Sequence, residues 1–460
     1  MSNDISISIP EEIETFLHTS STSLLIKGEP GTGKTILALS ILKTLKKTHG
    51  FYVTTRVKPQ TLTLTYPWIM DEIPPDHIID ASRKIFPIST GGEDSKTHFS
   101  IIKYSDKPTF LRELYQMLEG KKDSLVIIDS IEGIQEVTSE NIYYDLLEIQ
   151  KEVNSRFIFV SEYEEGKKLD YLVDGVILLK KEISENRFLR ELQILKLRGT
   201  FCKNHSYIFT LMGGIFRHFE PFKQKTPKEG KRFQPLPDSE THFSTGSEDL
   251  DNILGGGYKK GSTVLLELGK NVMREAYFHV LVPTALNFLS QGKKLIAIPS
   301  LGTSKETILS AISGFLGEDE MSRIKIVEKR WAQDKLYKTR QELLEDFHYT
   351  LGEVLSKVKP ESCVISLGLD SLFVKYGDSL IEVLETGIFD IQKKRLLAQW
   401  NVKHGTNRID EIANMVNYHF KIEEKGGVFI FHSLKPRTGT YTIETDFTKG
   451  YPQLKLVPIA

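Results

Sequence analysis

The sequence is poor in cysteine and contains no long apolar run. Its 460 residues include two cysteines, Cys202 and Cys363, which lie far apart and form neither a disulfide framework nor a metal-binding pattern. No apolar run approaches the ~20 residues that a membrane-spanning helix requires. The start of the chain lacks the basic segment and apolar core of a signal peptide. These absences predict a protein of the reducing cytoplasm without a membrane segment.

The sequence also lacks an excess of charge of either sign. It contains 60 basic and 61 acidic residues, for a formal net charge of −1. A protein whose main partner is the nucleic-acid backbone usually carries surplus positive charge, so nucleic acid is not an expected partner, although a local basic patch is compatible with this balance. A chain of 460 residues exceeds what one hydrophobic core supports, and two or three domains are expected.

The most informative stretch is a glycine-rich loop between an apolar run and a helical pattern. Residues 24–35 read LLIKGEPGTGKT and contain G-x-x-x-x-G-K-T, the pattern of a phosphate-binding P-loop. Its glycines allow successive backbone N–H groups to turn toward a phosphate, and the following helix points its positive end at the same anion. The pattern predicts a phosphate site formed by Gly28, Glu29, Pro30, Gly31, Thr32, Gly33, Lys34, Thr35 and Ile36.

Three residues have predicted chemical roles at this site. Lys34 supplies a cation for the β- and γ-phosphates, and the Thr35 hydroxyl is a ligand for Mg²⁺. Asp129 ends the apolar run Leu-Val-Ile-Ile, where a carboxylate can hold the same Mg²⁺ through water. The alternative for Asp129 is a helix cap or a turn residue.

The first half alternates between strand-like and helix-like patterns. Short β-branched runs predict strands near residues 50–55, 124–130 and 156–160, and helical spacing predicts helices over 110–118 and 142–153. Further strands are expected at 170–179 and 187–200. This rhythm indicates a parallel sheet with helices on both faces, with ligands at the carboxyl ends of the strands.

The expected strand 187–200 ends in K-L-R-G-T, which places Lys196 and Arg198 on one face. Two cations beside a nucleotide domain suggest phosphate contact. The alternative is a solvated edge strand whose charges oppose aggregation.

These motifs together resemble the KaiC-like branch of the RecA superfamily. The resemblance is carried by the G-x-P-G-T-G-K-T loop, the Val-Ile-Ile-Asp-Ser strand, a D-G-V-I-x-L strand and the K-L-R-G-T strand, in that order. The segment YVTTRV, with Tyr66-Pro67-Trp68 after it, resembles the archaeal GvpD-like members. The resemblance implies ATP and Mg²⁺ as ligands, a homo-oligomer, and a catalytic set of Lys34, Asp129, Lys196 and Arg198, the last two reaching the nucleotide of a neighbouring subunit.

The chain departs from this family where a catalytic carboxylate is expected. Many members carry a Glu-Glu pair after the second strand, but this sequence reads Thr54-Thr55-Arg56. Arginine does not deprotonate near neutral pH and cannot act as a general base. Arg56 could stabilise phosphate charge or form an ordinary salt bridge, and the candidates for orienting water are Glu132, Glu162 and Glu164. Nucleotide binding is therefore predicted, while fast hydrolysis is not.

The second half begins with a new copy of the same kind of domain. Residues 220–240 are rich in proline and basic residues and predict an extended, mobile spacer, with contact to nucleic acid or an acidic partner as the alternative for the basic run. Residues 243–266 resemble the entry to a KaiC-like domain, but no Gly-Lys-Thr follows, and Glu267 is expected where phosphate would sit. The strand 362–367 would correspond to the one that ends at Asp129, with either Gly368 or Asp370 at the equivalent place.

The predicted fold is therefore α/β, with two tandem RecA/KaiC-like domains, each a mostly parallel sheet flanked by helices. Residues 1–220 form the ATP-binding domain, 221–240 the linker and 241–460 a degenerate domain without a functional P-loop. The expected function is a slow ATPase that switches assembly or binding of an unidentified protein partner. The alternatives are a DNA-recombination ATPase and an ATP-binding scaffold without turnover.

Overall fold

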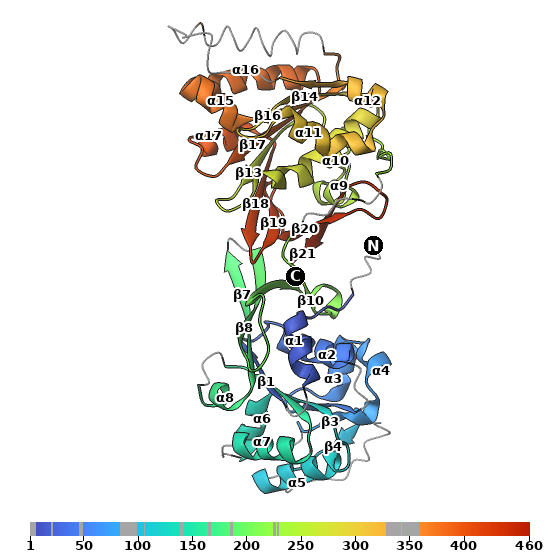
Figure 1. Cartoon of the computed structure of the whole chain (residues 1–460), viewed down its shortest axis with the longest axis vertical. Helices are drawn as coiled ribbons and strands as arrows, with labels where there is room; N and C mark the ends of the chain where they lie inside the picture. Colours follow the sequence, from blue (N-terminus) through green and yellow to red (C-terminus); the bar gives the residue numbers. More distant parts are fainter. Residues whose placement is uncertain are drawn as a thin grey trace. The chain divides into compact units, whose positions relative to one another are not determined.

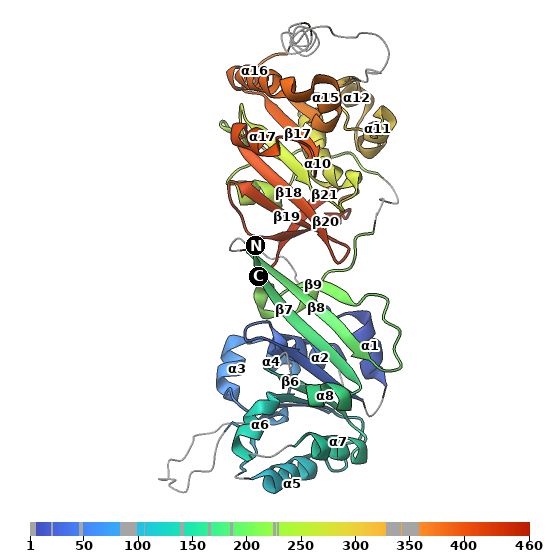
Figure 2. The same cartoon turned by 90° about the vertical axis from the view of Figure 1, so that its left-hand side faces the viewer.

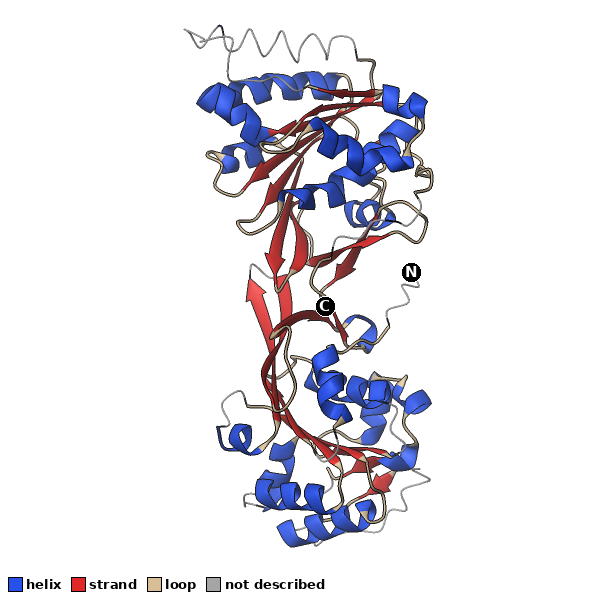
Figure 3. Cartoon of the chain, in the orientation of Figure 1, coloured by secondary structure: helices blue, strands red, loops and turns tan. Residues whose placement is uncertain are grey.

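The structure of the chain is a computed structural model that describes residues 6–19, 22–45, 49–82, 99–104, 106–138, 142–163, 167–184, 187–223, 227, 230–327, 342 and 358–460. It divides into two compact units, Met1–Glu220 with Ile459–Ala460, and Pro221–Pro458. Each unit contains one large, mostly parallel sheet flanked by helices (Figure 1 and Figure 3). The predicted α/β class is confirmed.

The first unit is built on a sheet with the strand order β10-β9-β8-β7-β1-β6-β5-β2-β3-β4. The strands from β7 to β4 in this order pair in parallel, and β7 to β10 pair antiparallel. Figure 2 shows the antiparallel strands β7, β8 and β9 side by side. The strands are β1 Ser23–Gly28, β2 Gly50–Thr54, β3 Ile78–Asp80, β4 Ser100–Ile101, β5 Leu125–Asp129, β6 Arg156–Ser161, β7 Gly175–Ser184, β8 Arg187–Leu197, β9 Ser206–Thr210 and β10 Arg217–His218.

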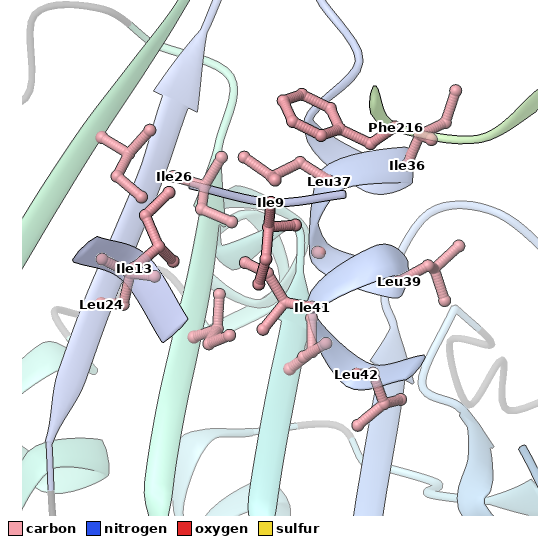
Figure 4. Close-up of a cluster of buried hydrophobic side chains, with 14 of the residues drawn as sticks. Ile9, Ile13, Leu24, Ile26, Ile36, Leu37, Leu39, Ile41, Leu42 and Phe216 are labelled. Atoms are coloured by element: carbon pink, nitrogen blue, oxygen red, sulfur yellow. The ribbon is translucent and has the colours of Figure 1, made fainter. Parts of the chain in front are cut away.

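Helices cover both faces of this sheet. Leu24 and Ile26 of β1 pack in the same cluster as α1 and α2, whereas Leu25 packs on the opposite face with α5 and α7, as the alternation of a strand requires. Figure 4 shows the first cluster, in which the apolar side chains of α2 meet those of β1. The helices are α1 Glu11–His18, α2 Lys34–Leu45, α3 Pro59–Thr65, α4 Ile69–Glu72, α5 Lys107–Leu118, α6 Ile131–Thr138, α7 Tyr143–Glu152 and α8 Lys167–Leu172.

The expected strand at residues 170–179 is wrong in its first half. The short helix α8 runs to Leu172, and β7 begins only at Gly175. The reason is Asp174, whose carboxylate accepts hydrogen bonds from the backbone N–H and the hydroxyl of Ser23 at 3.1 and 2.7 Å. This contact turns the chain at Asp174, so that the strand begins beside the start of β1.

The second unit has a sheet with the strand order β15-β14-β16-β17-β13-β18-β19-β20-β21. The order from β15 to β18 is parallel, and β18 to β21 pair antiparallel. A separate pair, β11 and β12, lies outside this sheet. The strands are β11 His242–Phe243, β12 Tyr258–Lys259, β13 Thr263–Leu268, β14 Lys294–Ile298, β15 Ile324–Ile326, β16 Cys363–Gly368, β17 Leu397–Lys403, β18 Tyr418–Lys425, β19 Val428–Lys435, β20 Tyr441–Asp446 and β21 Gln453–Pro458.

Two groups of helices cover the faces of the second sheet. The buried residues of α9, α10 and α11 join one hydrophobic cluster, and those of α15, α16 and α17 join another. The arrangement repeats that of the first unit around β1. The helices are α9 Glu248–Leu254, α10 Phe278–Ser290, α11 Lys305–Ile312, α12 Glu318–Ser322, α15 Leu369–Tyr376, α16 Leu380–Lys393 and α17 Ile409–Met415.

The segment expected to be a linker contributes to the packing of the second unit. The ring of Phe222 lies 4.7 Å from that of Phe429, and Phe233 is buried with its ring 4.8 Å from that of Tyr451. The aromatic side chains within this proline-rich and basic segment thus pack against apolar side chains of the second unit. At these positions the segment is packed, and the expectation of a mobile spacer is wrong there.

His279 in α10 gives the second unit an expected sensitivity to acid. Its Nδ1 lies 2.8 Å from the Thr445 hydroxyl, its ring is 4.9 Å from that of Phe222, and burial lowers the pKa of His279 to about 4. The unfolded chain protonates this histidine near pH 6.5, whereas the folded chain does so only near pH 4. The contribution of neutral His279 to the free energy of unfolding is therefore complete above pH ~6.5 and is lost toward pH 4, by up to about 3 kcal/mol. Urea unfolding between pH 4 and 7 should show this loss, and His279→Gln should reduce it.

The control for this experiment is His18→Gln, because the His18 side chain is 59% exposed. That variant should retain the loss of stability of the unmodified chain. An acid profile that His279→Gln leaves unchanged would contradict the assignment to His279.

Candidate functional site

The loop between β1 and α2 has a backbone shape that only glycine supports at two positions. Gly28 and Gly33 have φ angles of 154° and 101°. A Cβ on Gly28 would lie 2.3 Å from the carbonyl oxygen of Leu179, and one on Gly33 would lie 2.6 Å from the side chain of Leu211. The backbone of the loop therefore packs closely against Leu179 and Leu211, and a side chain at either glycine would clash with them.

Lys34 begins α2 and turns its side chain back over this loop. Its ammonium donates hydrogen bonds to the carbonyl oxygens of Gly28 and Glu29 at 2.6 and 2.9 Å, and only 8% of the residue is exposed. A buried ammonium among backbone groups at a helix N-terminus is well placed to bind an anion. The loop, the helix end and Lys34 together fit a phosphate.

Asp129, at the end of β5, lies against the first turn of α2. Its carboxylate accepts hydrogen bonds from the hydroxyls of Thr35 at 2.6 Å and Tyr52 at 2.5 Å. Burial raises the pKa of Asp129 above its ordinary value, although the two hydroxyls oppose this shift. Burial, together with the charge of Asp129, raises the pKa of Tyr52 well above its ordinary value, so the phenol remains a donor.

The pair of Thr35 and Asp129 fits a hard cation such as Mg²⁺. Both supply oxygen ligands, and Mg²⁺ in nucleotide sites is commonly held by one or two protein oxygens together with phosphate oxygens and water. Among the described residues no group of three or more His, Cys, Asp and Glu side chains is arranged to hold a metal ion. Thr35 and Asp129 could hold Mg²⁺ together with phosphate oxygens and water.

The segment after β2 is occupied by hydrogen bonds and an ion pair. The Thr55 hydroxyl donates to the carbonyl of Ser130 at 2.6 Å and accepts from its N–H at 2.8 Å, while the Thr54 hydroxyl donates to the carbonyl of Val57. Arg56 forms an ion pair with Glu162 at 2.6 Å. Of the two alternatives for Arg56, the structure contains the salt bridge.

Among the candidate carboxylates, Glu132 has an oxygen that could still orient water. Its Oε1 accepts from the Ser161 hydroxyl at 2.5 Å and from the N–H of Glu162 at 3.3 Å. Its Oε2 is buried and has no hydrogen-bond partner among the described residues. Glu162 is paired with Arg56, and Glu164 lies outside the described residues.

Comparison with known proteins agrees with this geometry. Residues 16–217 match the KaiC ATPase family model, and residues 232–319 match GvpD basic region 2. Protein GvpD1 of Halobacterium salinarum is 32% identical over 305 residues, or 63% of this chain and 56% of that protein. Protein GvpD2 of the same organism is 29% identical over 67% of this chain and 65% of its own length. Residues 16–217 are therefore similar to the KaiC ATPase family, and the chain is similar to the GvpD proteins.

The chain is more distantly similar to circadian clock oscillator proteins. The circadian clock oscillator protein KaiC of Thermostichus vulcanus is 25% identical over 287 residues, or 56% of this chain and 51% of that protein. The chain thus aligns with less than two thirds of the length of each of these three relatives. The part of the chain that the structure describes contains no helix long and apolar enough to cross a bilayer.

In this KaiC-like domain, Lys196 and Arg198 lie away from the loop of their own chain. Gly28 pairs with Leu179 and Leu179 with Leu192, so Lys196 is about four residues further along β8, ~13 Å at ~3.3 Å per residue. The Lys196 ammonium donates to the carbonyls of Asp170 and Val173, and Arg198 pairs with Asp174 at 3.3 Å. Both cations therefore pair with residues near the start of β7 and not with the loop of their own chain, and a role at a neighbouring subunit stays a prediction.

Arg190 is a loop contact that sequence reasoning missed. Its guanidinium donates to the carbonyl of Gly31 at 3.0 Å, and burial lowers the pKa of Arg190 below its ordinary value. The available signal was the alternation of β8, which places Arg190 on the same face as Leu192 and Ile194, toward α2. Arg190 thus holds the loop at the Gly31 carbonyl.

The described residues of the second unit contain no equivalent of this site. Glu267 was expected in the phosphate position, but strand pairing places it inside β13, where it contacts His419 at 3.1 Å. Burial favours a raised pKa, but the hydrogen bond from His419 and the charge of Lys421 lower the pKa of Glu267 below its ordinary value. The expectation for Glu267 is wrong because β13 extends one residue beyond Glu267, to Leu268, so that Glu267 is a strand residue and not a loop residue.

The strand register also identifies the counterpart of Asp129. Asp129 pairs with Val160 at the end of β5, and Gly368 pairs with Asn401 at the end of β16. A Cβ on Gly368 would lie 2.4 Å from the backbone of Ser300, so no carboxylate fits there. Of the two alternatives, Gly368 and not Asp370 is equivalent to Asp129.

Proposed function

We propose that this protein binds Mg·ATP in its first unit and hydrolyses it slowly, and that the bound nucleotide switches self-assembly or the binding of a protein partner. The observation that carries this proposal is the glycine loop closed by Lys34, with Thr35 and Asp129 joined at 2.6 Å beside it. A KaiC-like ATPase domain over residues 16–217 supports ATP as the nucleotide.

Each residue of the site would act through a contact described above. Lys34 would exchange its carbonyl partners for β- and γ-phosphate oxygens, and the N–H groups of the loop would hold the same phosphates. Thr35 and Asp129 would hold Mg²⁺, which when bound neutralises phosphate charge. Tyr52 would keep the Asp129 carboxylate oriented toward Thr35.

Slow hydrolysis is inferred from the side chains after β2. A water must be oriented for attack on the γ-phosphate, and Thr54, Thr55 and Arg56 are engaged in other contacts. Glu132 is the best remaining candidate, because its Oε2 is unpaired among the described residues. An ATP-binding scaffold without turnover is the second candidate, favoured by the absence of a carboxylate at positions 54–56.

The regulatory part of the proposal rests on the relatives. Several are named circadian clock oscillator proteins, and others are GvpD proteins. A switch rather than a metabolic enzyme is also consistent with low turnover. The nearly balanced charge of the chain gives no support to a DNA-recombination ATPase.

ATP is expected to promote assembly through Lys196 and Arg198. Because the backbone of Lys196 lies ~13 Å along β8 from the level of Gly28, and Arg198 lies two residues further, a phosphate contact is proposed to come from a neighbouring subunit. Light scattering should show a dimer or ring with Mg·ATP, and Lys196→Ala combined with Arg198→Ala should remain monomeric while still binding ATP.

Lys180→Ala is the matched control, because this exposed cation lies on the adjacent strand β7. It should assemble as the unmodified chain does. A strict monomer under all nucleotide conditions would refute the proposed role of the pair.

A further inference from the structure

The second unit contains a pocket that the nucleotide chemistry does not use. It lies between α10, α11 and the ends of β14, β16 and β17, and encloses about 820 Å³ of space not filled by protein atoms, including its open mouth. Its lining includes Ala297, Ser366, Gln399 and Asn401 on the floor and Val282 on the wall.

The two sheets can be superimposed by their strand pairing. Ile26 and Leu266 each lie two residues before the end of their central strand, pairing with Val160 in one unit and Asn401 in the other. With these two residues aligned, the strand register of the neighbouring strands is the same in both units. The equivalent pairs are Tyr52 and Ala297, Ile127 and Ser366, Ile158 and Gln399, and Val160 and Asn401.

This comparison explains why a pocket exists in one unit. The first unit fills the layer beneath α2 with Tyr52, Ile127, Ile158 and Val160, all at most 1% exposed. In the second unit a methyl group replaces the tyrosine, and a hydroxyl and two carboxamides replace the three aliphatic side chains. Space and hydrogen-bonding groups have therefore appeared together on the face of the sheet beneath α10.

The two carboxamides carry polar atoms without partners. Gln399 and Asn401 are 2% and 7% exposed, and among the described residues Gln399 Nε2 and Asn401 Oδ1 make no hydrogen bond of good geometry. The polar group near Gln399 is the buried hydroxyl of Tyr258, which makes none either. The other end of Asn401 is fixed, because its Nδ2 donates to the Ser300 hydroxyl at 2.8 Å. A buried donor and acceptor left unpaired destabilise the fold, and a ligand that pairs both would remove that cost.

The chemistry of the lining defines the ligand. Gln399 and Asn401 are two residues apart on β17 and so face the same side, where one offers a donor and the other an acceptor. Leu281, Val282 and Ala285 of α10 supply apolar surface, and the described lining contains no lysine or arginine. Its one charged side chain, Glu275, is exposed to solvent. We propose that this pocket binds a small neutral molecule with a carboxamide-like edge, carrying a donor and an acceptor, on an apolar body.

Three probes of matched shape test this proposal on the full chain. Benzamide is neutral with a donor and an acceptor, benzoate is an anion, and toluene has no polar group. Saturation-transfer NMR titrations are run with Mg·ATP in excess, so that the first unit is occupied. Benzamide should bind at millimolar concentration. Benzoate and toluene should bind at least about tenfold more weakly, because burying the benzoate charge is costly and toluene leaves the carboxamides unpaired.

Variants assign the binding to the pocket. Gln399→Ile restores the residue found at the equivalent place in the first unit and should weaken benzamide at least about tenfold without lowering thermal stability. Ala297→Leu should abolish binding by filling the space. Gln392→Ile, an exposed position on α16, should change neither binding nor stability.

Three results would overturn the proposal. The first is no benzamide binding to the unmodified chain at millimolar concentration. The second is equal binding of all three probes, which would mean apolar adsorption without recognition by the carboxamides. The third is benzamide binding that survives both Gln399→Ile and Ala297→Leu, because the probe would then bind elsewhere.

Discussion

Replacing Lys34 with alanine is expected to weaken Mg·ATP binding at least about a hundredfold. The Lys34 ammonium is buried and hydrogen-bonded within the loop, at 2.6 and 2.9 Å from two carbonyl oxygens, where it would meet the β- and γ-phosphates. Charge-assisted hydrogen bonds contribute roughly 1.5–3 kcal/mol each, and two of them correspond to about a hundredfold or more in Kd. Titration with a fluorescent ATP analogue measures the loss.

Lys43→Ala is the control for this variant. Lys43 lies in the last turn of the same helix and pairs with Glu72 at 3.0 Å, with about a third of each side chain exposed. Its removal should leave the affinity unchanged. If Lys34→Ala retained the affinity of the unmodified chain, the glycine loop would not be the nucleotide site.

Turnover should be slow, and Asp129→Ala should abolish it. A competent enzyme of median rate turns over at ~10 s⁻¹, and loss of a positioned base costs about 10²–10⁴, which predicts roughly 0.1 s⁻¹ or below. Asp129 is the one carboxylate hydrogen-bonded to Thr35 among the described residues, so its loss would remove the proposed metal ligand. Release of phosphate over many turnovers measures both rates.

Asp145→Ala is the matched control, since this half-exposed carboxylate on α7 pairs with Lys107 at 2.8 Å. It should turn over as the unmodified chain does. Turnover well above ~1 s⁻¹ would show that another carboxylate orients the water. Glu132→Gln would then be the first variant to measure, because Glu132 Oε2 is unpaired among the described residues.

The glycine loop and the alternation around it could be predicted because they are local. The P-loop pattern depends on residue types that the backbone itself requires, as the close approach of Gly28 to Leu179 illustrates. Buried strands such as β5 are continuous apolar runs with few competing patterns. The resemblance to KaiC and GvpD proteins, the fold class and the position of Asp129 at a strand end therefore followed from the sequence.

The parts that could not be predicted depend on contacts between distant segments. Nothing near Tyr52 indicates that its hydroxyl reaches Asp129, 77 residues away. Arg190 contacts Gly31 across 159 residues of sequence. The turn at Asp174 depends on Ser23, and the place of Glu267 depends on how far β13 continues. Such features require the sheet register, which a single sequence does not contain.

The second unit keeps the sheet of the first without its phosphate chemistry. The equivalent of Asp129 is Gly368, where a Cβ would lie 2.4 Å from the backbone of Ser300, and no Gly-Lys-Thr follows β13. The layer beneath α10 has instead acquired Ser366, Gln399 and Asn401. The second unit therefore has a pocket lined by polar groups where the first unit has a packed apolar layer.

Calorimetric titration of the full chain with Mg·ATP tests the central claim most directly, because it counts sites as well as measuring affinity. The account predicts one site per chain, lost in Lys34→Ala and retained in Gln399→Ile. Two sites per chain, or one site that survives Lys34→Ala, would contradict it.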